Sequence, residues 1–312
     1  MNSPDAGWFK LKLKSALANT EEDIDRNIEF TLKTNYKRYQ DLIGTQSGAV
    51  SIVGSGPSLK ANWKKLRDSG TDIVACNAAC QFLLERGVVP KYMFCFDADP
   101  LIYEFFTKHQ DITYLIASRV PPKTWELLEG CNVYVWHAGG DKNIESLLQK
   151  HGKVDENAEP MVTGGSAAVT RCIHLVQPLG YTEIHLWGAD SSFEEDNTHI
   201  RKSTTVERRI RIQADKRVFE TAPWMAQQIE DFKILIPALT SFHKIDVVVH
   251  GDGLLPHIAR AMTKPGCEEY KNIPSGRLRV EDGEPYWKRF VREVIWEAIE
   301  WNRKAKQLWQ YI

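Results

Sequence analysis

The sequence carries almost no net charge and contains no long hydrophobic run. Its 40 Lys and Arg residues balance 41 Asp and Glu residues, so no overall positive field attracts nucleic acid or an anionic membrane. The N-terminal residues lack the continuous apolar core of a signal peptide, and no segment approaches the length of a membrane span. We therefore expect a cytoplasmic protein with no membrane span, for which nucleic acid is not the favoured partner.

The six cysteines follow neither a metal-binding nor a disulfide pattern. The sequence has no Cys-x-x-Cys pair and no Cys/His cluster with zinc spacing. We expect reduced and mostly buried thiols. Internal repeats and low-complexity segments are also absent, and 312 residues with 43% hydrophobic and 26% charged side chains are typical of a globular protein.

Short apolar segments alternate with helical patterns from about residue 50 to residue 250. The segments AVSIVG, DIVAC, KYMFCFD, TYLIAS, NVYVWH, EIHLWGAD and DVVVHG read as strands. Strands that alternate with helices predict an α/β fold with a doubly wound, Rossmann-like and mostly parallel sheet. We assign this domain to residues 49–257.

Helical appendages are expected on both sides of this domain. In residues 1–48, a helix should begin near Thr20 and extend toward Leu42, with Ile24, Ile28 and Leu32 at helical spacing. Residues 258–312 combine a loop with a Trp-rich amphipathic helix. We expect that helix to pack against the body of the protein or against a second subunit, which would form a homo-oligomer.

A glycine-rich loop follows the first predicted strand of the domain. Its residues are Gly54, Ser55, Gly56, Pro57 and Ser58, and a helical pattern begins directly afterwards. Glycines let the backbone N–H groups approach an anion, and the start of a helix adds partial positive charge. The loop matches neither the Walker motif nor Gly-x-Gly-x-x-Gly, so it fits a phosphate-binding loop or a structural strand-to-helix turn.

Three segments that include this loop resemble one family. They are IVGSGPSL, ACNAACQFLLERGVVPKYMFCFDADP and TGGSAAVTRCIHLVQPLGYTEIHLWGADSSFEEDNTH. In order and spacing they resemble the MptE-like family (6-hydroxymethylpterin diphosphokinase-like), with related patterns in motility-associated factor proteins and bacterial sialyltransferases. The pterin enzymes transfer a diphosphoryl group from ATP, and the sialyltransferases transfer a sugar from CMP-sialic acid. The resemblance therefore implies that a nucleotide is recognised through its phosphates.

The second segment contains an amide and two acids at the ends of predicted strands. Asn77 follows DIVAC, and the resemblance to the sialyltransferases places it at the nucleotide, whereas a helix cap is the structural alternative. Asp97 and Asp99 follow KYMFCF and could together bind a divalent ion such as Mg²⁺. The sialyltransferases do not need a metal, and acids after a strand also form turns.

The third segment contains a second glycine-rich helix start and two candidate catalytic residues. The turn of Thr163, Gly164, Gly165 and Ser166 could form another anion site, and the resemblance assigns donor phosphate to Ser166 or Thr163. Asp190 ends the strand EIHLWGAD, and His199 follows in the same polar stretch. Both suit acid–base chemistry or acceptor binding, although a polar loop is the alternative.

Two further features are secondary candidates. His250 ends the strand DVVVHG and has glycines after it. The segment from Arg201 to Arg217 is rich in basic residues and could close over an anionic donor, form a solvated helix face, or follow a nucleic-acid backbone.

These features together predict a nucleotide-dependent transferase. The favoured reaction is diphosphoryl transfer from a nucleoside triphosphate to a hydroxyl of a small-molecule or glycan acceptor. The alternatives are a glycosyltransferase that uses a nucleotide sugar and a binding module without catalysis.

Overall fold

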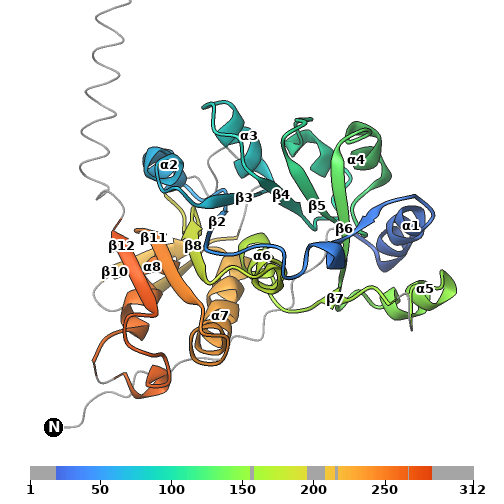
Figure 1. The fold of residues 1–312 in the computed structure, drawn as a ribbon. Coiled ribbons are helices and arrows are strands. Elements are labelled where there is room, and N and C mark those ends of the chain that lie inside the picture. Colours follow the sequence, from blue (N-terminus) through green and yellow to red (C-terminus); the bar gives the residue numbers. More distant parts are fainter. Residues whose placement is uncertain (1–18, 155–157, 195–207, 215–216, 266, 283–312) are drawn as a thin grey trace, which may run out of the picture.

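The computed structural model describes residues 19–154, 158–194, 208–214, 217–265 and 267–282 (Figure 1). The strands are β1 (Lys37–Arg38), β2 (Ala49–Val53), β3 (Asp72–Cys76), β4 (Tyr92–Cys95), β5 (Thr113–Ala117), β6 (Asn132–Ala138), β7 (Met161–Val162), β8 (Glu183–Trp187), β9 (Ile210–Ala214), β10 (Arg217–Thr221), β11 (Asp246–Gly251) and β12 (Leu278–Asp282). The α-helices are α1 (Glu21–Leu32), α2 (Leu59–Arg67), α3 (Ala78–Leu84), α4 (Pro122–Leu127), α5 (Ile144–Lys150), α6 (Ala168–Val176), α7 (Pro223–Pro237) and α8 (Leu254–Met262).

The main sheet is parallel and has the order β1-β6-β5-β4-β3-β2-β8-β11-β12, with β7 paired to β6. Helices cover both of its faces (Figure 1). This arrangement explains the continuous apolar strands, because a parallel sheet between two helical layers is buried on both faces. The predicted Rossmann-like α/β fold is confirmed.

The strand order reverses direction between β2 and β8. From β2 the chain adds β3, β4, β5 and β6 on one side, and it later returns to place β8 on the other side of β2. In open α/β sheets such a switch point creates a crevice at the carboxyl ends of the strands, and ligands bind there. The loops after β2 and β8 meet at this crevice.

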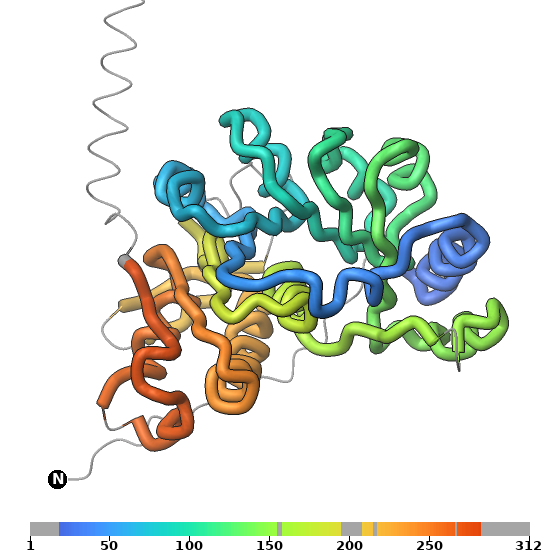
Figure 2. Tube along the Cα trace, in the orientation of Figure 1, coloured from blue at the N-terminus to red at the C-terminus, as the bar shows by residue number. Residues whose placement is uncertain are grey.

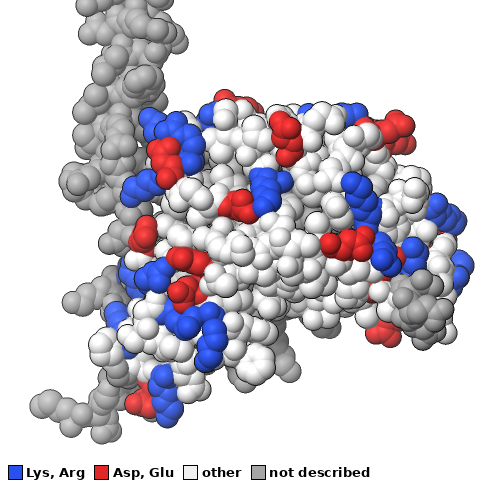
Figure 3. Space-filling view, viewed as in Figure 1, with Lys and Arg blue, Asp and Glu red and all other residues white. Residues whose placement is uncertain are grey.

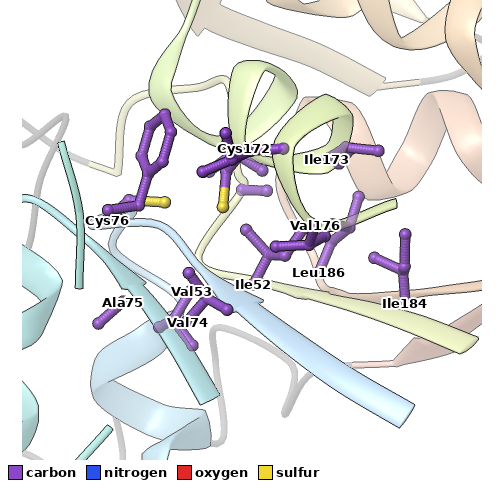
Figure 4. Packing of buried hydrophobic residues seen from close by; sticks show 14 of the residues in the cluster. Ile52, Val53, Val74, Ala75, Cys76, Cys172, Ile173, Val176, Ile184 and Leu186 are labelled. Atoms are coloured by element: carbon purple, nitrogen blue, oxygen red, sulfur yellow. The ribbon is translucent and has the colours of Figure 1, made fainter. Parts of the chain in front are cut away.

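Helix α6 packs over the strands on either side of the switch point. Cys172, Ile173 and Val176 from α6 face Ile52 of β2 and Leu186 of β8 (Figure 4). All five side chains are fully buried. This packing fixes the N-terminal end of α6 above the crevice.

The N-terminal segment is shorter as a helix than predicted. The expected helix start is confirmed, because Thr20 and Asp23 form a capping box, and Ile24, Ile28 and Leu32 pack against α5. The helix ends at Leu32, ten residues before the expected end. The following chain forms β1 on β6 and then runs to β2 (Figure 2).

Several strands had not been predicted. Besides the short strands β1 and β7, they are β9 and β10, which form an antiparallel pair at the end of the basic stretch, and β12, which extends the sheet beside β11. The domain boundaries at residues 48 and 257 stay a prediction. The predicted Trp-rich helix, His199 and the segment 201–207 lie outside the described residues.

Candidate functional site

A pocket of about 260 Å³ lies at the switch point. It is bordered by the loops that follow β2, β3, β4 and β8, by the start of α6 and by the start of α7. The lining residues are Gly54, Ser55, Gly56, Cys76, Asn77, Phe96, Asp97, Ser166, Ala167, Ala168, Val169, Gly188, Ala189, Asp190, Ser191, Trp224, Met225 and Gln228. Both predicted glycine-rich turns thus contribute to one pocket.

The loop after β2 uses most of its N–H groups within the protein. Gly54 and Gly56 donate to the carbonyl oxygens of Trp187 and Gly188, each over 2.8 Å. Ser58 donates to the Asp190 carboxylate over 2.8 Å, and proline has no N–H group. Among the described residues, the N–H of Ser55 is the remaining backbone donor of the loop, and Ser55 lines the pocket. The loop therefore offers fewer free N–H donors to an anion than its glycine content predicts.

The two glycines are required by contact with β8. A Cβ atom on Gly54 would lie 2.6 Å from the Gly188 oxygen, and one on Gly56 would lie 2.5 Å from the same atom. Both distances are shorter than any tolerated Cβ contact. The glycines thus bring the backbones of two strands together, and this close approach shapes the floor of the pocket.

Asp190 lies at the meeting point of three loops. Its side chain accepts the Ser58 N–H at the start of α2, and its backbone oxygen accepts the Leu255 N–H at the start of α8. Gly253 packs directly on it, since a Cβ there would lie 2.7 Å from the Asp190 Cα. Asp190 lines the pocket, but one carboxylate oxygen already orders the glycine loop.

Asn77 lies across the glycine loop from Asp190 and has a strained backbone. Its φ of 47° and ψ of −123° are unusual for a residue with a Cβ. Its side chain makes no cap bond to α3, and its Oδ1 is buried without a hydrogen-bond partner. The side chain of Asn77 therefore does not cap α3, which was the structural alternative. Strain and an unsatisfied buried acceptor at a pocket are both typical of a functional residue.

The second glycine-rich turn has two consecutive left-handed residues. Gly164 and Gly165 have φ values of 84° and 73°. The turn directs the Ser166 N–H to the carboxylate of Asp231 on α7, over 2.5 Å. Ser166 lines the pocket, whereas Thr163, Gly164 and Gly165 do not.

The two acids after β4 do not both line the pocket. The strand ends at Cys95, so the alternation expected of a strand does not extend to Asp97 and Asp99. Asp97 lines the pocket, and burial raises its pKa. Its Oδ1 accepts the Asp99 N–H over 3.0 Å, and Asp99 in turn accepts the Leu101 N–H over 2.8 Å. These two bonds form successive turns. Among the described residues, no cluster of three metal-ligating side chains exists.

Several lining residues were not singled out from the sequence. Phe96 follows β4, Ser191 follows β8, and Trp224, Met225 and Gln228 come from the start of α7. Ser191 has a φ of 49°. No sequence signal marks the α7 residues, because they reach the pocket only through the tertiary packing of α7.

His250 belongs to a different cluster on the sheet. Its ring stacks on Trp187 with a centroid distance of 3.5 Å and bonds to His185 over 2.9 Å. Burial, with smaller contributions from His185 and Lys65, lowers the pKa of His250 to about 3. His250 does not line the pocket, so its role is that of a packed, neutral side chain.

The charges around the fold are mixed. On the face in view, acidic and basic side chains are interspersed (Figure 3). Among the described residues that line the pocket, none is Lys or Arg, and two are carboxylates, Asp97 and Asp190. No described helix is both long enough and apolar enough to cross a bilayer.

The switch-point pocket and the parallel sheet define a Rossmann-like α/β protein with a ligand site at the carboxyl ends of its strands. A family model described as 6-hydroxymethylpterin diphosphokinase MptE-like matches residues 23–196, which is more than half of the chain. The chain therefore belongs to the MptE-like family, which is named for a transferase, and the predicted resemblance is confirmed. No curated protein matches the sequence.

One solved structure supports the fold, and others match more weakly. The MAf glycosyltransferase from Magnetospirillum magneticum AMB-1 matches with a TM-score of 0.55 and 18% identity, over 77% of this chain and 38% of that chain. This chain thus spans well under half the length of that protein. A mammalian sialyltransferase in complex with Gal-beta-1-3GalNAc-ortho-nitrophenol matches with a TM-score of 0.35 and 13% identity, over 73% and 79% of the two chains. The sialyltransferase CST-II in complex with a trisaccharide acceptor and CMP matches with a TM-score of 0.34 and 16% identity, over 64% and 80%.

Proposed function

We propose that the protein is a transferase that binds a nucleotide donor in the switch-point pocket. The observation that carries this proposal is Asn77, whose strained backbone holds an unsatisfied, buried amide oxygen at the pocket wall. Such strain costs about 1–3 kcal/mol and persists where function requires it. A sugar hydroxyl or a base amine of a nucleotide would satisfy the amide oxygen.

The donor phosphate lies over the glycine loop in this proposal. Ser55 lines the pocket, and so do Ser166 and Ala167 at the start of α6. A backbone N–H group attracts an anion, and the Ser55 N–H is the loop amide that no group of the described protein uses. The phosphate would thus lie between the two glycine-rich turns.

A magnesium ion fits the pocket only as an ion shared with donor phosphates. Mg²⁺ often binds through one or two carboxylates plus substrate phosphates and water. Asp97 is the residue that would hold it, because Asp97 lines the pocket and Asp99 does not. The bound ion would neutralise phosphate charge.

The family name makes diphosphoryl transfer to a hydroxyl acceptor the first candidate reaction. Glycosyl transfer from a nucleotide sugar is the second candidate, and the charge of the pocket favours it. The described lining offers two carboxylates and no cationic side chain, which suits a CMP-sugar, with its single phosphate, better than a triphosphate without a metal. In either reaction, Asp190 holds the glycine loop in place, and His199 stays a candidate acid or base.

A ligand screen followed by product analysis tests the proposal. ATP, GTP, CMP-sugars, UDP-sugars and GDP-sugars are tested by thermal shift, with and without Mg²⁺. A donor that raises the melting temperature is then incubated with hydroxyl acceptors, and release of AMP is compared with release of CMP, UDP or GDP. Binding without product formation would indicate a binding module, and failure of every nucleotide to bind would refute the proposal.

A further inference from the structure

The amide of Gln228 is oriented by a buried hydroxyl at the pocket wall. Ser191 Oγ donates a hydrogen bond to Gln228 Oε1 over 2.9 Å. Both residues are buried, with 6% and 5% of their surface exposed, and both line the pocket. A glutamine amide has an acceptor oxygen and an NH2 group with two donors. Because the oxygen is engaged by Ser191, the NH2 group is the end that a ligand can meet.

The position of Ser191 is itself tightly held. Its φ of 49° is one of three positive values at residues other than glycine in the described chain, and Asn77 has another. Thr221 Oγ donates to the Ser191 backbone oxygen over 2.8 Å. Ser191 thus has a strained backbone fixed by a buried bond, and the strain is kept where its hydroxyl orients an amide at the pocket.

Asn77 and Gln228 lie on opposite sides of the glycine loop. Asn77 follows β3 and Ser191 follows β8, and β2 with its glycine loop lies between these two strands. A ligand whose phosphate lies over the loop therefore extends toward Asn77 in one direction and toward Gln228 in the other. Both side chains are amides, but only Gln228 has its oxygen engaged by a protein hydroxyl, which leaves its NH2 donors for a ligand.

We propose that Gln228 determines donor specificity by hydrogen bonding to the transferred group, while Asn77 contacts the nucleoside. This inference rests on the proposed function. The bonded partner is an oxygen acceptor on the transferred group, which is a phosphoryl oxygen in ATP or a carboxylate or hydroxyl oxygen in a nucleotide sugar. Ser191 acts as a positioning residue, because it fixes which end of the amide faces the ligand.

The test compares a donor with its nucleoside monophosphate. Isothermal titration calorimetry measures Kd for each donor of the ligand screen and for its nucleoside monophosphate, for example ATP against AMP or CMP-N-acetylneuraminate against CMP, on whichever pair the wild type binds. Gln228→Glu keeps an oxygen for Ser191 but places a carboxylate where the NH2 group was. We expect it to weaken donor binding at least about ten-fold, since a hydrogen bond is replaced by repulsion of an oxygen acceptor, and to leave the monophosphate within about two-fold.

Two further variants keep the test decisive if Gln228→Glu folds poorly. Gln228→Met removes the donors without adding charge, and Ser191→Ala removes the hydroxyl that orients the amide. Both should weaken donor binding selectively, and Ser191→Ala should have the smaller effect because the amide is still present. Gln227→Met is the matched control, because Gln227 bonds to Asp231 and does not line the pocket, and it should bind both ligands as the wild type does.

Each other result overturns the assignment. Unchanged donor binding in the Gln228 variants would show that the amide donors do not meet the ligand. Equal losses for the donor and the monophosphate would place Gln228 at the nucleoside or its phosphate. If the wild type binds neither member of any pair, the proposed function itself is wrong, which is distinguishable from failure of the Gln228 assignment alone.

Discussion

The backbone N–H of Ser58 donates to the carboxylate of Asp190 over 2.8 Å. This bond joins the loop after β2 to the loop after β8 at the point where the strand order reverses. A carboxylate of the protein therefore takes one of the N–H groups that an anionic ligand would otherwise use. The glycine loop brings two strands into contact, and the part of it left for the proposed ligand is around Ser55.

Gly56→Ala should destabilise the protein even without a ligand. The added Cβ would lie 2.5 Å from the Gly188 backbone oxygen, which cannot move without shifting β8. We expect a loss of about 1–3 kcal/mol in the free energy of unfolding, as for overpacked cores, measured by urea denaturation. Gly87→Ala is the comparison, because no atom lies within 4 Å of its Cβ position and only its φ of 71° causes strain. We expect Gly56→Ala to be the less stable of the two variants. If it is as stable as Gly87→Ala or more stable, this account of the loop is wrong.

Asp190→Asn should also lower the stability of the ligand-free protein. The amide oxygen can still accept the Ser58 N–H, but the bond loses the strength that the negative charge provides. We expect a loss of about 1–2 kcal/mol, near the lower end for hydrogen bonds to charged groups, measured by chemical denaturation. Asp252→Asn is the control, because Asp252 forms a partly exposed ion pair with Arg217, and such pairs contribute about 0–1 kcal/mol. Wild-type stability in Asp190→Asn would mean that its carboxylate does not order the loop.

His250 should make the protein sensitive to acid. Burial lowers the pKa of His250 to about 3 in the folded protein, whereas an unfolded histidine has a pKa near 6.5. Below that value the unfolded state binds a proton and the folded state does not, so stability falls as the pH drops from about 6.5 toward 3. The linkage relation gives a loss of about 2 kcal/mol at pH 5 relative to pH 7.

Replacement of His250 tests this linkage directly. His250→Gln removes the titrating ring, and the free energy of unfolding should then change less between pH 7 and pH 5. The exposed His243 provides the control, and His243→Gln should keep the wild-type dependence. If His250→Gln has the same pH dependence as the wild type, then His250 is not held neutral by its surroundings.

The sequence predicts the fold well because the strands are short, apolar and evenly spaced. It also predicts that Gly54, Asn77, Asp97, Ser166 and Asp190 lie at one edge of the sheet, since each follows a strand or begins a helix. All five residues line one pocket in the structure. The carboxyl ends of parallel strands share an edge, and this rule needs no knowledge of distant contacts.

The sequence does not reveal which groups are already used within the protein. The partner of Ser58 is Asp190, 132 positions away, and the partner of Ser166 is Asp231, 65 positions away. Both depend on how strands and helices pack. The sequence of β9 does show the alternation of a strand, since Ile210, Ile212 and Ala214 alternate with polar residues. The many charged side chains around it made this pattern hard to recognise.

The most direct test of the nucleotide pocket replaces Asn77 by glycine. Glycine adopts the φ of 47° without strain, so Asn77→Gly should not lower the melting temperature, and it removes the amide that we assign to the nucleoside. Lys244→Gly is the matched control, because Lys244 has a φ of 60° and does not line the pocket.

Titration calorimetry with the nucleotide that stabilises the wild type decides the question. The account predicts that Asn77→Gly stays folded and binds at least about ten-fold more weakly, as for loss of a buried hydrogen bond, while Lys244→Gly binds like the wild type. Undiminished nucleotide binding by a folded Asn77→Gly protein would contradict it.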